Sequence, residues 1–156
     1  MTKRLFARMA RQSVMVPPGL ADRLEGLLAR RCCDTLGLAR RAGLAVAGYE
    51  RVGEAVRRGS AALLLCALDG AEAGRRRMAA GSRGIASANV LDAEELGGVF
   101  GRERAMFVAV GPGPLCSRLR IDLTRLAGFR PAAALEGIDI ATAGPSRQDD
   151  GTKAHE

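Results

Sequence analysis

The sequence predicts an α/β fold in which helices cover both faces of a sheet. Two runs, 61–67 and 105–110, are apolar throughout instead of alternating with polar residues, which is typical of strands buried on both faces. Segments with the apolar spacing of helices lie between these runs, as in layered α/β domains. A chain of 156 residues, 47% of them hydrophobic, is long enough for one domain with a core.

The first half of the chain is expected to form an extra N-terminal helix followed by strand, helix and strand. After the Pro-Pro-Gly break at 17–19, leucines recur at helical spacing, and this pattern can continue as far as Gly43. The leucines that begin it are Leu20, Leu24, Leu27 and Leu28. The elements that follow are a strand at 44–47, a helix at 49–58 and a strand at 61–67.

The second half repeats the alternation of helix and strand. The helix at 92–100 begins at Asp92, with Glu95 three residues later, as in a capping box. A Gly-Pro-Gly-Pro turn at 111–114 precedes the last helix. The remaining expected elements are a charged helix at 71–80, strands at 85–91 and 105–110, and the last helix at 115–126.

Charge and composition exclude several classes of protein. There are 24 basic residues against 17 acidic ones, for a net charge of +7, and a folded basic protein is suited to bind phosphates. No apolar run is long enough to span a bilayer and the N-terminus lacks the features of a signal peptide, so a cytoplasmic protein without a membrane partner is expected.

The sequence predicts no catalytic residue, metal site or cofactor. The four cysteines form no CxxC pair, and the single histidine, His155, lies in a polar segment. The Gly111-Pro112-Gly113 turn lacks the third glycine of a dinucleotide fingerprint, because position 116 is Cys116. The cysteines are expected to be reduced thiols, most of them buried.

Arginine clusters recur along the predicted helices, at 30–31, 40–41, 57–58 and 75–77. Each alone could be a solvated helix face, but several in a basic chain favour nucleic acid as a partner. Only five aromatic residues are present, so recognition of the backbone and shape is expected instead of base stacking on a sheet.

A family resemblance rests on the segments 36–43, 55–65, 92–97 and 101–104, together with Gly48. Their order and spacing resemble the ribosomal L-seven-Ae and L-thirty-e superfamily of RNA-binding proteins, particularly its bacterial YlxQ-like members. The likeness covers residues 34–128. It implies a three-layer α-β-α sandwich that contacts structured RNA, ribosomal or other non-coding RNA, as a non-enzymatic protein.

The resemblance also implies a site for RNA. In the family, RNA is held by the start of the helix that follows Gly48 and by the loop before the last strand, here Gly48–Glu54 and Phe100–Arg104. Where kink-turn-binding members have Asn-Glu-x-x-Lys, this chain has Glu50 and Glu54 in place of Asn and Lys, so general RNA binding is implied and kink-turn recognition is not. The implied RNA-binding residues are Arg40, Arg41, Gly48, Tyr49, Glu50, Arg51, Glu54, Phe100, Arg102 and Arg104.

The two ends of the chain are expected to lie outside this domain. Segments 4–8 and 16–20 resemble the C-terminal part of YlxR-type nucleic-acid-binding domains, so residues 1–33 are expected to be a basic arm and amphipathic helix left from such a domain. Residues 129–156 lack a strong period and are expected to be a flexible tail. The alternative function is a protein-interaction module of the translation machinery that docks through its leucine-rich helix without binding RNA directly.

Overall fold

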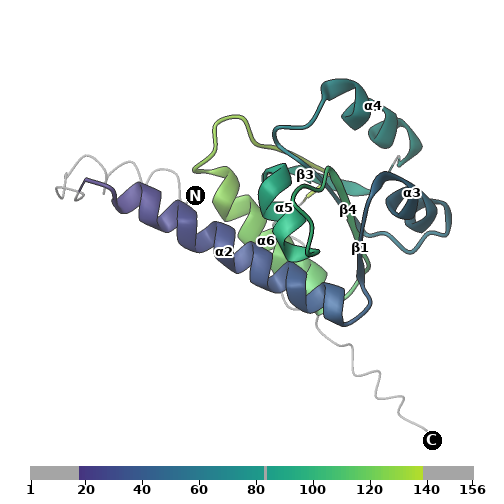
Figure 1. Ribbon diagram of the computed structural model, residues 1–156, viewed down its shortest axis with the longest axis horizontal. Helices are drawn as coiled ribbons and strands as arrows, with labels where there is room; N and C mark the ends of the chain where they lie inside the picture. Colours follow the sequence, from purple (N-terminus) through teal and green to yellow (C-terminus); the bar gives the residue numbers. More distant parts are fainter. Residues whose placement is uncertain (1–17, 83, 139–156) are drawn as a thin grey trace, which may run out of the picture.

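The computed structural model describes residues 18–82 and 84–138 as a five-stranded sheet between two layers of helices (Figure 1). The strand order is β1-β4-β2-β3-β5; β2 and β3 run parallel, and the other neighbours are antiparallel. The elements are α2 (Leu20–Arg41), β1 (Ala45–Ala47), α3 (Tyr49–Arg57), β2 (Leu63–Cys66), α4 (Glu72–Gly81), β3 (Ala86–Asn89), α5 (Ala93–Val99), β4 (Phe107–Val110), α6 (Pro114–Ala127) and β5 (Ala134–Glu136).

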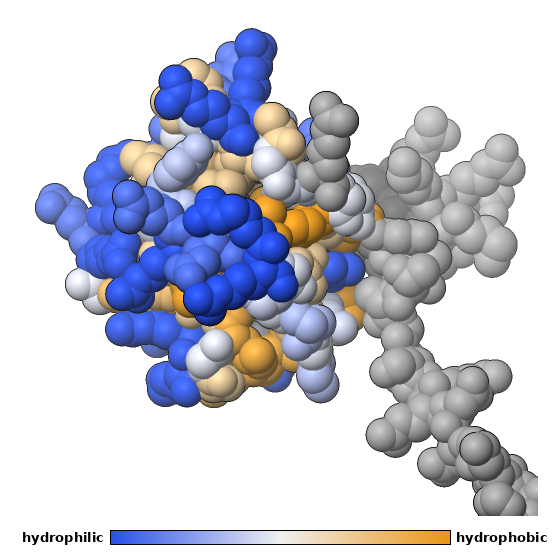
Figure 2. Space-filling model, turned by 90° about the vertical axis from the view of Figure 1, so that its right-hand side faces the viewer, coloured by the Kyte–Doolittle hydropathy of each residue, from blue (hydrophilic) through white to orange (hydrophobic). Residues whose placement is uncertain are grey.

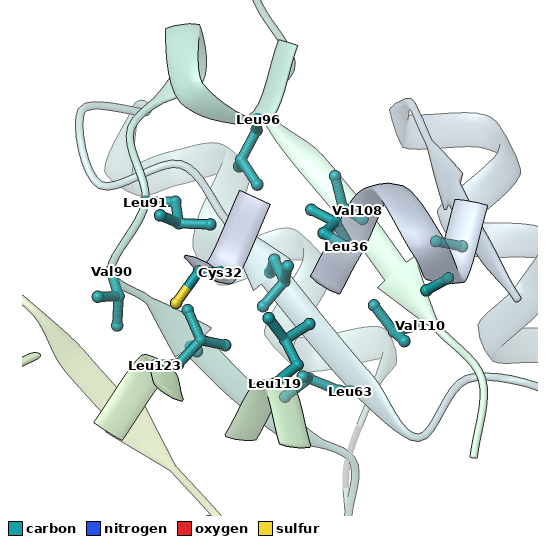
Figure 3. Packing of buried hydrophobic residues seen from close by; sticks show 14 of the residues in the cluster. Cys32, Leu36, Leu63, Val90, Leu91, Leu96, Val108, Val110, Leu119 and Leu123 are labelled. Atoms are coloured by element: carbon teal, nitrogen blue, oxygen red, sulfur yellow. The ribbon is translucent and has the colours of Figure 1, made fainter. Parts of the chain in front are cut away.

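The central strands are buried on both faces, as their uniformly apolar sequences predict. Leu63 and Leu65 of β2 belong to the larger core, which α2, α5 and α6 cover, whereas Leu64 belongs to a smaller core with Val52 of α3 and Met78 of α4. Figure 3 shows the larger core, where side chains of α2 and α6 meet those of the sheet. The predicted three-layer α-β-α architecture is therefore confirmed.

Helix α2 is continuous across residue 33, where the sequence placed a domain boundary. Its buried side chains, among them Cys32 and Leu36, form one stripe that packs on α6. Asp122 of α6, only 1% exposed, accepts a hydrogen bond from Arg31 Nε at 3.2 Å. Because this packing spans the boundary, the predicted division at 33/34 is wrong. Residues 1–17, which carry most of the YlxR-like likeness, lie outside the described residues.

The N-terminal turns of α2 extend beyond this packing (Figure 1). Leu20, Leu24 and Leu27 are 37%, 41% and 64% exposed, and Leu28 is half-buried. The leucine pattern therefore predicted the helix, but residues 18–82 and 84–138 cover only part of its apolar stripe.

Residues 129–138 belong to the fold, which corrects the prediction of a flexible tail from 129 onward. Strand β5 pairs with the edge strand β3. Arg130, whose side chain is 14% exposed, donates to both carboxylate oxygens of Glu95 at 2.6 and 3.0 Å, to Glu25 Oε1 at 3.0 Å and to Val90 O at 2.8 Å. One arginine thus ties this segment to α5 and α2. Residues 139–156 lie outside the described residues.

Two local predictions are confirmed. Asp92 and Glu95 form the predicted capping box at the start of α5, and the four cysteines are free thiols, three of them buried. Burial, followed by the charge of Asp122, raises the pKa of Cys32 to about 12. No helix within residues 18–82 and 84–138 is both long and apolar enough to cross a membrane.

Candidate nucleic-acid interface

The two segments that the resemblance assigned to RNA binding lie at the same edge of the sheet. Strand β1 is antiparallel to β4, so the end of β1 lies beside the beginning of β4, and Gly48 N–H donates to Phe107 O at 3.0 Å. Strand β2 is also antiparallel to β4, with Cys66 opposite Phe107. The start of α3 (48–51), the β2–α4 loop (67–71) and the α5–β4 loop (100–106) therefore meet, and we call this region the loop edge.

Gly48 brings the chain from β1 into α3 beside the side chain of Arg102. Its φ of 106° lies in the region that favours glycine, and Arg102 Nη1 lies 3.4 Å from the position that a Cβ on Gly48 would take. No side chain caps α3. The amide N–H groups of the first turn, before Val52 N–H bonds to Gly48 O at 2.9 Å, thus lack partners within the helix and can donate to an anion.

Tyr49 adds an aromatic surface to the loop edge. Its ring packs edge-on against Phe107, with 5.7 Å between ring centroids and 69° between planes, and the residue is 52% exposed. A ring held in this way can stack on an unpaired base without losing much side-chain freedom.

Two of the predicted arginines are engaged in holding the α5–β4 loop. Arg40 Nη1 donates to Val99 O at 2.9 Å, at the end of α5, and its guanidinium lies 5.6 Å from the centroid of the Phe100 ring. Arg104 Nη2 lies 3.0 Å from Asp69 Oδ2. Both side chains are exposed, so they can face a phosphate while they position the loop.

Asp69 is a site residue that the sequence reasoning missed. Its Oδ1 accepts a hydrogen bond from the Ala93 amide at 2.8 Å, and its Oδ2 binds Arg104. These bonds, that from the Ala93 amide first, lower the pKa of Asp69. The available signal was an aspartate at the end of an apolar run, three residues after the last residue of β2, in a loop of the kind that carries functional residues.

Arg41, Arg51 and Arg102 are exposed, and no carboxylate of the described residues forms an ion pair with any of them. The fold does not bring all three together. Arg102 lies at the loop edge, Arg51 lines a groove between α3 and α4, and Arg41 lines another between α2 and α5.

The groove between α3 and α4 extends from the loop edge and has a volume of about 680 Å³. Figure 2 looks onto this side of the molecule, whose surface is largely hydrophilic. The groove carries two arginines that the predicted site omitted, Arg57 and Arg77, although both belong to clusters visible in the sequence. Arg51 completes a set of three cations along it.

The two glutamates that replace the kink-turn motif also line this groove. Glu54 forms an ion pair with Arg58, the residue that directly follows α3. Glu50 lies in the first turn of α3, where a carboxylate is stabilised by the positive end of the helix dipole. The negative charge of Glu50 would repel a phosphate at this helix end. For the phosphate to bind, its attraction to the unpaired amide N–H groups of α3 and to Arg102 has to exceed this repulsion.

The three consecutive arginines of α4 divide between two environments, because successive side chains of a helix point about 100° apart. Arg77 lines the groove toward α3, whereas Arg75 and Arg76 line a different cleft against the sheet, where Arg76 pairs with Glu72 at 2.7 Å. They do not form one basic patch.

Comparison with known proteins identifies the fold. No protein-family model and no curated protein matches the sequence. Among solved structures, a protein of unknown function from Bacillus halodurans matches with a TM-score of 0.55 and 23% identity over 60% of this chain and 96% of that one. The 15.5kD RNA-binding protein of Giardia lamblia matches with a TM-score of 0.50 and 15% identity over 65% and 89% of the two chains.

The chain has the fold of a known RNA-binding protein. At these identities the likeness shows the α-β-α fold and not the ligand. It confirms the fold class that the sequence predicted, while the YlxQ-like and YlxR-like assignments stay predictions.

Proposed function

We propose that this chain is a non-enzymatic, cytoplasmic bacterial protein that binds structured RNA, ribosomal or other non-coding RNA, by the loop edge. Ribosomes or translation factors are its proposed partners. The L-seven-Ae-like resemblance and the RNA-binding neighbour with the same fold support the class of ligand. The uncapped start of α3 and the nearby side chain of Arg102 support the loop edge as the place of binding.

One observation carries the proposal: Arg102 lies against Gly48, beside the uncapped start of α3. This arrangement combines an exposed guanidinium, which suits bidentate contact with phosphate, with backbone donors and the positive end of a helix dipole. The half-exposed ring of Tyr49 borders the same place. Phosphate and an unpaired base are therefore the chemistry that the loop edge fits.

The test measures binding of ribosomal RNA fragments as a function of salt. Log affinity should fall linearly with log salt, with a slope of about −0.7 to −0.9 for each phosphate neutralised. Arg102→Glu should weaken binding at least tenfold at low salt and reduce the steepness of the slope by about one phosphate.

Arg118→Glu is the matched control, because Arg118 is an exposed arginine on α6, outside the elements that build the loop edge. Both variants change the net charge equally, so a general electrostatic effect would weaken both alike. Equal losses in the two variants, or affinity that does not depend on salt, would contradict the proposal.

The exposed leucines of α2 favour a second candidate, a protein-interaction module. A partner groove could receive Leu20, Leu24 and Leu27 as anchors at helical spacing. A pull-down from cell extract, with and without RNase, separates the two functions. Translation components that stay bound after RNase, and are lost in a Leu24→Glu, Leu27→Glu variant, would favour direct protein docking.

A further inference from the structure

A cleft of about 290 Å³ lies between α4 and the sheet, on the side of α4 that faces β3 and β5. Its size is near the lower end of pockets that hold small molecules, about 300–1,000 Å³. It is separate from the loop edge and from the groove between α3 and α4, and nothing in the proposed function uses it.

The floor of this cleft carries polar side chains of β3 and β5 beside apolar ones of β2. Leu64 pairs with Ser87 and Ser87 pairs with Glu136, so these three side chains form one row across β2, β3 and β5. Asn89 lies two residues along β3 on the same face, opposite the small side chain of Ala134. A hydroxyl, an amide and a carboxylate thus face the cleft.

The roof is also polar. Glu72, Arg75, Arg76 and Ala79 line the cleft from one face of α4, and Met78 is the buried side chain of that helix. Arg76 and Glu72 pair with each other at 2.7 Å. Arg75 Nε is buried and has no hydrogen-bond partner within the described residues, a state that is unfavourable unless an acceptor supplies the bond.

Arg75 and Glu136 are therefore the two charges of this lining that no ion pair within the described residues satisfies. Both act on Cys66 of β2, at the cleft floor. Burial raises the pKa of that thiol to about 11, while Arg75 acts to lower it and Glu136 to raise it. A ligand that fills the cleft must accept hydrogen bonds from a guanidinium and donate them to a carboxylate.

Guanine has this combination on one small planar molecule. Its N7 and O6 accept from arginine, the commonest specific contact of that base, and its N1–H and amino group can donate to a carboxylate. Adenine offers no N1–H and presents an amino group where guanine has O6. The Asn89 amide adds an NH2 group that donates and a carbonyl oxygen that accepts beside these groups.

We propose that the cleft between α4 and the β3–β5 edge binds a guanine base, supplied either by an unpaired nucleotide of RNA or by a free guanine nucleotide. The first source rests on the proposed function, whereas the second does not. The binding of an extruded base between a helix and a sheet would add sequence preference to contacts that otherwise recognise phosphate and shape.

The test uses the full chain and three probes: guanosine monophosphate, a short single-stranded RNA containing guanines, and the same strand with adenines in their place. At fixed salt the chain should bind the guanine strand about tenfold more tightly than the adenine strand, the discrimination of one good base contact. It should also bind the free nucleotide in a calorimetric titration.

Glu136→Gln and Asn89→Ala should each reduce that tenfold preference to about twofold. Arg77→Met is the control, because it removes a charge from the same helix on the side facing α3; it should weaken both strands alike and leave their ratio unchanged. Thermal unfolding of each variant checks that it is folded. The two substitutions lie on different strands, β3 and β5, so if one variant fails to fold the other still tests the proposal.

The outcomes separate the two proposals. Binding of both strands with equal affinity, without binding of the free nucleotide, overturns the guanine pocket and leaves RNA binding intact. Binding of the free nucleotide alone supports the pocket and contradicts RNA binding. An unchanged preference in both Glu136→Gln and Asn89→Ala also overturns the pocket.

Discussion

Two adjacent glycines of α5 should respond oppositely to substitution by alanine. A Cβ on Gly97 would lie 2.7 Å from both the Cα and the amide nitrogen of Arg104, and 2.9 Å from Arg102 O. A Cβ on Gly98 would meet nothing within 4 Å. Because the atoms that crowd Gly97 belong to backbone, the α5–β4 loop itself has to move in a Gly97→Ala variant.

The magnitude follows from two opposing effects. Alanine in place of a helical glycine stabilises by about 0.5–1 kcal/mol, and forcing an extra carbon into a closed contact costs about 1–3 kcal/mol. We therefore expect Gly97→Ala to lower the free energy of unfolding by up to about 2.5 kcal/mol, and Gly98→Ala to raise it by up to about 1 kcal/mol.

Urea unfolding followed by circular dichroism measures both variants against the unmodified chain. Gly97→Ala should in addition weaken RNA binding, because the displaced loop carries Arg102 and Arg104, whereas Gly98→Ala should leave binding unchanged. If both variants are equally stable, the loop does not rest on α5 as described. If Gly97→Ala is destabilised but binds RNA normally, the loop is a structural feature and not part of the interface.

The remaining predictions concern Arg130 and its partner Glu95. Arg130→Met should lower the free energy of unfolding by about 2–4 kcal/mol, because it leaves the half-buried carboxylate of Glu95 and Val90 O without their donor. The control is Arg125→Met, whose ion pair with Asp122 is 3.9 Å long, and it should lower the free energy of unfolding by less than about 1 kcal/mol. Burial alone would raise the pKa of Glu95, but hydrogen bonds from Arg130 and from the Asp92 amide outweigh it and lower that pKa. A lowered carboxylate pKa contributes stability that is present above its unfolded value, near 4.5, and is lost as pH falls through the folded value. The stability gap between the unmodified chain and Arg130→Met should therefore narrow below about pH 4, and urea midpoints that keep the same separation from pH 7 to pH 3 would contradict this account.

Strand β5 and the contacts of Arg130, at the C-terminal end of the described residues, could not be predicted from the sequence. Strand β5 has three residues, Ala134–Glu136, too few for a recognisable alternation, and its place is decided by pairing with β3 and by the contacts of Arg130. Nothing local to Arg130 identifies Glu95 and Glu25 as partners, since they lie 35 and 105 residues away. Such contacts exist only once the chain has folded.

The fold class and one local motif could be predicted from the sequence, whereas the arrangement of the candidate site could not. The sequence by itself determined the α/β class, because the uniformly apolar strands require cover on both faces, and it determined the capping box, because that motif is local. The loop edge depends on β1 and β2 both running antiparallel to β4, which brings Gly48, Asp69 and Arg102 to one place. Only the tertiary structure decided which arginines form ion pairs, and that Arg75 and Arg76 line one cleft while Arg77 lines another groove. The reason is that the charge of a side chain is fixed by the sequence, while its partners are set by the packing of distant elements.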